Sequence, residues 1–494
     1  MRASGILLHI SSLPSKYGIG TYGQSAYDFV DFLKKTGQTY WQILPLGPTS
    51  YGDSPYQTFS AFANNPYFID LDILVSEKLL RKSEIKATVK DLRRVDYATL
   101  YQERFDVLKK AFKRFDLNDP RFILFVNENK DWVTDYALFM AIKAHYQGVS
   151  WSFWDEPIRT YDQAAVAYAK MAFRDEMNFH LFLQFKADQQ WMALKKYANE
   201  QGILIVGDMP IYVSYDSSDV WANAELFDLD EQKRPNYVAG VPPDNFTKDG
   251  QLWGNPLYRW PVMEANGYAW WIKRVKAAQI MFDWVRIDHF IGFVNYYRVP
   301  FGEQTAKHGL WIKGPGLKVF EAIRQALGHV NIIAEDLGAI TDEVRDVLKA
   351  SGFPGMKIMQ FAFDPKEPSD YLPHNYTRNT IVYTGTHDNE TTQTWFNHLS
   401  EESLKYCLNY INHSGSKTRY VDSLIKATLL SISDTAIIPY QDYLRLTEEA
   451  RMNIPSTLGN NWAWRAKRSD FSKSRAARIQ LWTQLYGREN KKTE

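Results

Sequence analysis

Eight short runs of β-branched or apolar residues constrain the fold of this chain more than any other feature of its sequence. The runs lie at residues 5–10, 40–46, 203–211, 283–289, 331–337, 357–363, 380–386 and 435–440. Segments with helical spacing of apolar residues separate several of them, as at Ala26, Phe29, Val30 and Leu33. Alternation of strands and helices favours a parallel sheet, and eight such strands predict a closed (β/α)8 barrel, or TIM barrel, of the α/β class.

The spacing of the runs predicts large insertions in this barrel. Residues 47–202 separate the second run from the third, far more than the few residues of an ordinary βα connection. We therefore divide the chain into residues 1–72 with strands one and two, a mostly helical insertion subdomain at 73–169, and residues 170–494 with the other strands. Two irregular segments, 215–260 and 300–316, are predicted to be long βα loops over the active-site face.

Charge and composition exclude several classes of function. The 494 residues include 58 Lys plus Arg and 57 Asp plus Glu, a formal net charge of +1, so no overall field attracts nucleic acid or an anionic membrane. No apolar run could span a bilayer, and the first residues lack the long apolar stretch of a secretory signal. The single cysteine, Cys407, fits a reducing compartment. We expect a cytoplasmic protein, a monomer or homodimer, with a neutral partner.

The segment 282–290 is an apolar strand that ends in charged residues. Arg286 and Asp288 are two positions apart, so their side chains point to the same face of the strand. At the mouth of a barrel the guanidinium would keep the carboxylate ionised and able to act as a nucleophile. A structural ion pair at the barrel rim explains this motif equally well on its own. Asp283 has the opposite parity and is expected to face the helices.

Two further strands also end in acidic residues. After the run at 331–337, Glu335 has the reach that a general acid needs, whereas Asp336 is explained as a loop or capping residue. The seventh strand leads into His387 and Asp388. Acids at the ends of three strands cost energy in a barrel mouth unless they are used. Two carboxyl groups that flank a bond are what glycoside chemistry requires, one as nucleophile and one as acid and then base.

Metal-dependent hydrolysis is an alternative use of the same residues. His289 follows Asp288 and His387 precedes Asp388, and barrel hydrolases with two metals also collect His and Asp at strand ends. Those enzymes usually carry a His-x-His motif at the end of the first strand, where this sequence has only His9. We therefore predict that the chain uses no metal and no cofactor.

Several longer strings carry a family resemblance. They are SPYQTFSAFANNPYFIDL at 54–71, GDMPIY at 207–212, VPPDNF at 241–246 and QLWGNP at 251–256. The order of Asp288, Glu335 and Asp388 on strands four, five and seven is similar to that of the α-amylase superfamily. The strings resemble bacterial amylomaltase, a 4-α-glucanotransferase also called disproportionating enzyme, and the resemblance runs from residue 5 to residue 465.

This resemblance implies an enzyme that transfers α-1,4-glucan segments between maltooligosaccharides with retention of anomeric configuration. By the resemblance, Asp288 is the nucleophile, Glu335 is the acid/base, and Asp388 binds sugar hydroxyls and stabilises the transition state. The substrate-binding residues that it implies are Arg286, His289, His387, Asp208, Trp253, Asp244, Tyr56 and Ser54. The string GNNWAWR at 459–465 carries a doubled Asn, which leaves open whether Asn460 or Asn461 faces the substrate.

Three of these binding residues also have a structural explanation. Asp208 fits a loop cap, Trp253 a loop-anchoring hydrophobe and Tyr56 a packed rim residue.

Two other functions also stay open on the sequence alone. An α-glucan hydrolase of the same superfamily would shorten chains without exchanging them. A glucan-binding barrel without catalysis would keep the aromatic residues and lose the acids, yet all three acids are present.

Overall fold

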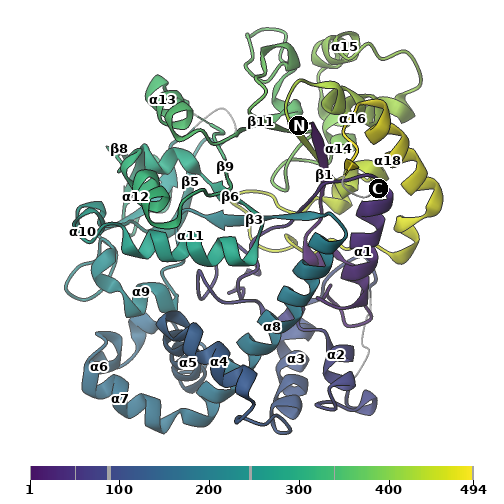
Figure 1. Ribbon diagram of the computed structural model, residues 1–494. Coiled ribbons are helices and arrows are strands. Elements are labelled where there is room, and N and C mark those ends of the chain that lie inside the picture. Colours follow the sequence, from purple (N-terminus) through teal and green to yellow (C-terminus); the bar gives the residue numbers. More distant parts are fainter. Residues whose placement is uncertain (1, 51, 86–90, 244–246, 339, 492–494) are drawn as a thin grey trace.

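The protein forms a parallel eight-stranded barrel, described by a computed structural model for residues 2–50, 52–85, 91–243, 247–338 and 340–491 (Figure 1). The strand order is β10-β11-β12-β1-β2-β3-β6-β9. The strands are β1 Ala3–Leu7, β2 Tyr40–Gln42, β3 Leu204–Pro210, β6 Trp284–Asp288, β9 Ile332–Ala334, β10 Gly355–Ile358, β11 Thr380–Tyr383 and β12 Thr435–Pro439. Each predicted run overlaps one of these strands, and the predicted TIM barrel is confirmed.

The barrel closes between β9 and β10 through two individual hydrogen bonds. The backbone N–H of Ala334 donates to the carbonyl oxygen of Pro354 at 3.0 Å. The backbone N–H of Met356 donates to Oδ1 of Asp336 at 2.6 Å. The carboxylate of Asp336 therefore stands where a regular ladder would offer a backbone carbonyl, and its side chain closes the seam of the barrel.

Helices cover the outside of the sheet. They are α1 Gln24–Lys35, α8 Arg174–Glu200, α11 Ala269–Met281, α12 Lys318–Leu327, α13 Asp342–Ser351, α14 Thr392–His398, α15 Glu401–Tyr410, α16 Tyr420–Leu430, α17 Tyr440–Leu444 and α18 Lys473–Leu485. Asp283, just before β6, lies 3.5 Å from Nζ of Lys195 and accepts a hydrogen bond from Asn199, both on α8. The prediction that Asp283 faces the helices is confirmed, so it lies apart from the barrel mouth.

Further helices lie between β2 and β3, in the lower part of Figure 1. They are α2 Leu71–Ser76, α3 Tyr97–Phe112, α4 Pro120–Glu128, α5 Lys130–His145, α6 Glu156–Arg159 and α7 Gln163–Ala172. Aspartates cap the N-termini of four of them, with Asp70 before α2, Asp96 before α3, Asp119 before α4 and Asp162 before α7. The boundaries 1–72, 73–169 and 170–494 stay a prediction.

The segments 215–260 and 300–316, predicted to be long βα loops over the active-site face, contain secondary structure of their own. They contain α9 Ser218–Ala222 and the strands β4 Tyr237–Val241, β5 Gln251–Pro256 and β8 Leu310–Lys313. β7 Asn295–Pro300 completes a four-stranded antiparallel sheet with them, and α10 Trp260–Ala265 begins at the end of the first segment. Glycine and proline, such as Gly240 and Pro256, interrupt the alternation that normally marks a strand. Pairing between strands, rather than the local alternation of residues, therefore makes these segments extended.

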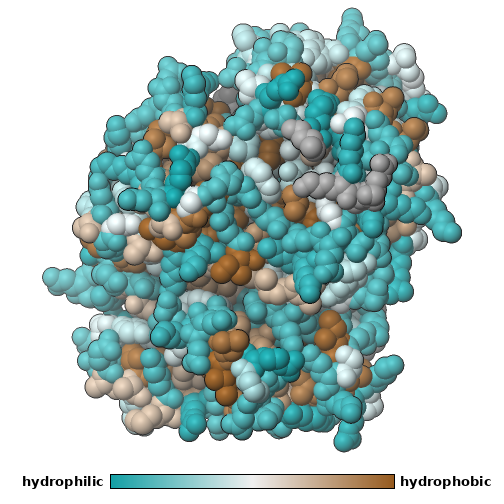
Figure 2. Space-filling view, in the orientation of Figure 1, coloured by the Kyte–Doolittle hydropathy of each residue, from teal (hydrophilic) through white to brown (hydrophobic). Residues whose placement is uncertain are grey.

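The face of the molecule in Figure 2 is mostly hydrophilic, and its apolar side chains are scattered in small groups. Within the described ranges, no helix combines the length and the apolar character needed to cross a membrane.

Candidate active site

The carboxyl ends of β3 and β6 bring together two carboxylates and one guanidinium. Asp208 on β3 pairs in register with Arg286 on β6. Nη1 of Arg286 donates to Oδ1 and Oδ2 of Asp208 at 2.8 and 2.7 Å, and its Nη2 lies 2.8 Å from Oδ1 of Asp288. Asp208 and Arg286 are buried, whereas the side chain of Asp288 is 28% exposed. Asp288 is therefore the member of this group that a substrate can reach.

Arg286 keeps its charge in this buried position. Burial works against the charged guanidinium, but the carboxylates of Asp208 and Asp288 raise its pKa above the usual value. Burial raises the pKa of Asp208, with Arg286 opposing the rise, so one buried cation faces two acidic groups at the barrel mouth. Such a mouth favours a substrate on which positive charge develops during reaction.

Tyr56 and His387 extend the group toward Asp388. The hydroxyl of Tyr56 donates to Oδ2 of Asp208 at 2.7 Å and lies 2.9 Å from Nε2 of His387. The two rings stack with centroids 5.3 Å apart. Because the single hydroxyl proton goes to Asp208, Nε2 of His387 must carry a proton to bond the Tyr56 oxygen. The same nitrogen lies 3.2 Å from Oδ2 of Asp388, so a continuous polar chain joins Asp208 to Asp388.

Glu335 follows β9 and is only 8% exposed. Its Oε2 accepts a hydrogen bond from the backbone N–H of His289 at 2.6 Å, and its Oε1 accepts one from Leu337 at 3.1 Å. Burial raises the pKa of Glu335 to about 8, with Arg286 opposing the rise and Asp288 adding to it. At neutral pH this carboxyl group is therefore largely protonated, as a general acid must be.

His289 offers an unoccupied nitrogen to the site. Its backbone is left-handed, with φ of 52°, and burial lowers its pKa to about 4, so the ring is neutral. Nε2 of His289 is buried and has no hydrogen-bond partner among the described residues. The ring of Trp253 on β5 meets it edge-on, with centroids 4.8 Å apart. Because buried polar atoms are normally paired, Nε2 is available to bind a polar group of a ligand.

Three residues that contact Asp388 or its neighbours Tyr56 and His387 were not among the predicted site residues. Asn453 donates from Nδ2 to Oδ1 of Asp388 at 2.6 Å, and Arg451 donates to the carbonyl oxygen of Asp388 at 3.0 Å. The ring of Trp462 packs against those of Tyr56 and His387, with centroids 5.7 and 5.8 Å apart. Trp462 belongs to the string GNNWAWR, which was a signal for it. Arg451 and Asn453 lie in irregular chain without a recognisable motif.

The remaining predicted residues lie at the edge of this arrangement or outside it. Oγ of Ser54 accepts a hydrogen bond from the backbone N–H of Tyr56 at 3.3 Å, so Ser54 supports the turn that presents Tyr56. Asp244 lies outside the described residues. The side chain of Asn461 bonds within its own loop, to Ile454 and Thr457.

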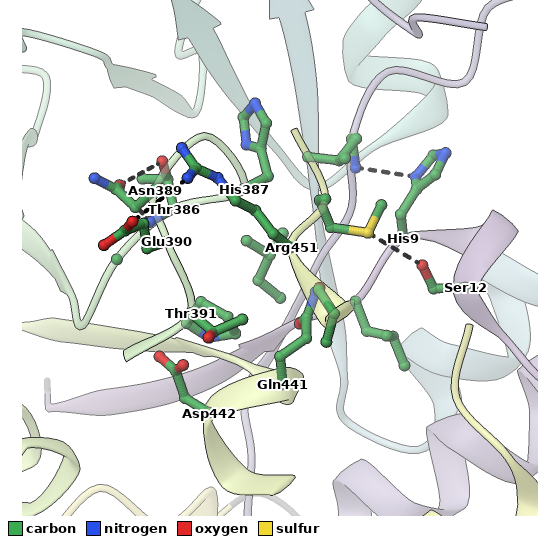
Figure 3. A pocket seen from close by; sticks show the side chains of 17 residues that line it. His9, Ser12, Thr386, His387, Asn389, Glu390, Thr391, Gln441, Asp442 and Arg451 are labelled. Atoms are coloured by element: carbon green, nitrogen blue, oxygen red, sulfur yellow. Dashed lines mark hydrogen bonds and ion pairs between the residues drawn. The ribbon is translucent and has the colours of Figure 1, made fainter. Parts of the chain in front are cut away.

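A small cavity lies beside His387, at the ends of β1, β11 and β12 (Figure 3). Its volume of about 20 Å³ is enough for one water molecule. His9 lines it, accepts a hydrogen bond at Nδ1 from the backbone of Leu44, and has a pKa that burial lowers to about 3. Figure 3 shows Arg451 reaching toward Glu390 across the same region. Among the described residues, no group of three or more His, Cys, Asp or Glu side chains is placed to hold a metal ion.

Comparison with known proteins gives a consistent assignment. Residues 8–470 match the family model described as 4-alpha-glucanotransferase. A 4-alpha-glucanotransferase of Clostridium butyricum is 47% identical over 97% of this chain and 100% of its own length. One from Thermus thermophilus is 45% identical over 97% of each chain. The structure of an amylomaltase from Streptococcus agalactiae in complex with acarbose has a TM-score of 0.96 and 44% identity, over 99% of this chain and 100% of that one.

These matches span the barrel and its insertions together, and they agree with the resemblance carried by the sequence strings. The chain therefore belongs to the 4-alpha-glucanotransferase family and is an enzyme of that class.

Proposed function

We propose that this enzyme transfers α-1,4-glucan segments from a donor maltodextrin to the 4-hydroxyl of an acceptor glucan or glucose, by a retaining double displacement. One observation carries the proposal. An accessible carboxylate, Asp288, lies beside a buried acid, Glu335, whose pKa is about 8. One group can attack carbon while the other donates a proton, and this division of roles is what a retaining glycosidic reaction needs.

In the first step Asp288 attacks the anomeric carbon of the sugar at the cleavage point. The bond between that carbon and the glycosidic oxygen breaks, and Glu335 gives its proton to the leaving oxygen. The released glucan departs with a new 4-hydroxyl, and the donor segment stays as an ester on Asp288. Glu335 is now a carboxylate.

In the second step the 4-hydroxyl of an acceptor loses its proton to Glu335, and its oxygen attacks the same carbon. The ester to Asp288 breaks and frees the nucleophile. Two inversions at one carbon leave the configuration unchanged, so the product is again an α-1,4-linked glucan.

The surrounding residues bind the sugar and stabilise positive charge on it. Asp388, 40% exposed, binds hydroxyls and stabilises the oxocarbenium-like transition state. The unpartnered Nε2 of His289 accepts or donates to a further hydroxyl. His387, Arg286 and Asp208 orient the acids, Trp253 and Tyr56 supply aromatic surface, and Ser54 acts through Tyr56. We keep Asp244 as a proposed binding residue.

Maltooligosaccharides and α-1,4-glucans are the proposed partners, with no role for nucleic acid or membrane and no cofactor in the chemistry. The cytoplasm is the proposed compartment, which suits a chain whose single cysteine is buried and free.

The experiment is incubation with maltotriose and separation of the products. It compares the wild type with Asp288→Asn and with a matched control, Asp283→Asn, which changes an acid at the opposite end of β6. The expected result is glucose plus a ladder of longer oligosaccharides from the wild type and Asp283→Asn only. Shortening alone would favour the hydrolase. An unchanged substrate with the wild type would overturn the function, and a full ladder from Asp288→Asn would remove Asp288 as nucleophile.

A further inference from the structure

The carboxylate of Asp388 is held at both oxygens, by two different segments. Oδ2 lies 3.2 Å from Nε2 of His387, and Oδ1 accepts a hydrogen bond of 2.6 Å from Nδ2 of Asn453. We propose that Asn453 is a positioning residue, which fixes the carboxylate of Asp388 in the orientation that the transition state needs. This inference rests on the proposed function of Asp388.

The backbone around Asp388 needs support from outside. Strand β11 ends at Tyr383, so residues 387 and 388 lie on a loop beyond the last ladder hydrogen bonds of the barrel. The backbone N–H of Asn453 donates to the carbonyl oxygen of His387 at 3.1 Å, and Nη2 of Arg451 donates to that of Asp388 at 3.0 Å. The segment 451–453 therefore holds the backbone of both residues as well as the carboxylate.

Arg451 also holds Asn453 itself. Nε of Arg451 donates to the carbonyl oxygen of Asn453 at 2.9 Å. Its Nη1 lies 3.8 Å from Glu390 and 3.6 Å from Glu448. The guanidinium is thus oriented by acidic partners on two sides. Its hydrogen bonds to the carbonyl oxygens of Asp388 and Asn453 set the distance between the loops that carry these two residues.

The same segment is the stem of a loop that reaches the binding rings. The backbone N–H of Trp462 donates to the carbonyl oxygen of Met452 at 2.6 Å, which closes the loop 452–462. Trp462 then packs against Tyr56 and His387. One side of the stem therefore holds Asp388, and the other packs against the two rings beside it.

An amide suits this position better than a charged donor. Asn453 fixes the rotation of the carboxylate and adds no positive charge, so Asp388 keeps its full negative charge for the developing oxocarbenium ion. The second lone pairs of both oxygens stay available for sugar hydroxyls. A lysine or arginine here would offset that charge and weaken the electrostatic stabilisation.

The first test compares Asn453→Ala with Asn118→Ala, an exposed amide of the helical insertion that bonds to Asp116 within its own turn. For Asn453→Ala we expect kcat for maltotriose to fall on the order of 10- to 100-fold, with KM changed less than about threefold. Asn118→Ala should stay within about twofold of the wild type in kcat. Melting temperatures from calorimetry identify any general loss of folding.

The second test is Asn453→Asp, which keeps the shape and replaces the donor by an acid facing Asp388. The other titratable or charged groups that contact this segment are His387, Arg451, Glu390 and Glu448. Two adjacent carboxylates repel each other, so the pKa of the pair rises and a proton is shared at low pH. We expect this variant to be inactive at high pH and to regain activity as the pH falls, unlike Asn453→Ala.

A parallel Asp388→Asn variant separates the two levels of the argument. If Asp388→Asn is inactive while Asn453→Ala keeps the wild-type kcat, the positioning role is wrong and the proposed function stands. If Asp388→Asn is fully active, the proposed role of Asp388 fails. The inference would be overturned if the fall in kcat of Asn453→Ala were explained by a lower melting temperature and Asn453→Asp regained no activity at low pH. Asn453 would then have only a structural role.

Discussion

The backbone N–H of His289 donates a 2.6 Å hydrogen bond to Oε2 of Glu335, which joins the residue after the proposed nucleophile to the proposed acid. The backbone continues the connection. Glu335 donates from its N–H to the carbonyl of Ile287 at 3.0 Å, and its own carbonyl accepts from Phe290 at 3.0 Å. The separation of the two reacting groups is therefore set by the backbones of adjacent strands, β6 and β9, rather than by flexible side chains.

The state of Glu335 predicts an alkaline limit to activity. The acid must carry a proton to act on the donor, and it loses that proton as the pH rises through its pKa of about 8. We expect kcat/KM for maltotriose to fall above that pH. Glu335→Gln should remove this limb and lower activity on the order of 10²- to 10⁴-fold. If the residual activity of Glu335→Gln still fell above the same pH, the alkaline limit would belong to another group.

The sequence predicts the parts of the site that depend on local pattern. Strand parity places Arg286 and Asp288 together and sends Asp283 to the helices, because side chains alternate along a strand whatever its partners. Asn453 reaches Asp388 from 65 positions away in the chain, through a segment without periodicity. No local signal describes such a contact, since it depends on how two irregular loops meet.

The same reasoning explains the antiparallel sheet. Gly240 in β4 faces a strand whose backbone comes close, because a Cβ at this position would lie 2.5 Å from the carbonyl oxygen of Gln251. Gly240 marks a close approach between two strands, but from the sequence alone a glycine is equally typical of an irregular loop. Only the partner strand distinguishes the two.

The buried pair of Asp208 and Arg286 predicts a large effect on stability. Asp208→Asn leaves one fewer negative charge beside the buried guanidinium and disturbs the hydrogen bond to Tyr56. Removing one partner of a buried ion pair typically costs about 3–5 kcal/mol, and since Asp288 remains we expect about 3 kcal/mol in the free energy of unfolding. Denaturant unfolding measures this.

A matched control is Glu264→Gln, which breaks an exposed ion pair with Lys318. Exposed pairs contribute about 0–1 kcal/mol, so this variant should unfold close to the wild type. Equal unfolding midpoints for Asp208→Asn and Glu264→Gln would contradict a stabilising role for the buried pair.

Trp253 is expected to affect both substrate binding and whether the covalent intermediate reacts with an acceptor or with water. Its ring packs edge-on against His289, beside the proposed nucleophile. Trp253→Ala removes aromatic surface worth about 0.5–1.5 kcal/mol, so we expect KM to rise about threefold to tenfold. It also opens the site to water, and the ratio of glucose release to transfer should increase.

Product analysis with maltotriose measures that ratio directly. Trp253→Phe keeps a ring and should lie between the alanine variant and the wild type. Trp311→Ala is the control, because Trp311 belongs to the same antiparallel sheet but is exposed and packs on Tyr297. An equal shift in the transfer ratio for Trp311→Ala would mean that the sheet as a whole, rather than the ring at His289, excludes water.

Glu335 and Asp336 are adjacent carboxyl groups with different predicted tasks. Asp336 accepts the backbone N–H of Met356 and closes the barrel seam. Asp336→Ala leaves that buried N–H without its partner, which should cost about 1–3 kcal/mol of unfolding free energy. Asp336→Asn can keep the acceptor oxygen, so it should retain both stability and the alkaline limb of the pH profile. Glu335→Gln should also keep the barrel folded, but it should transfer little glucan. Loss of transfer in a stable Asp336→Asn protein would show that the two acids act together in the reaction, because its seam contact would then be intact.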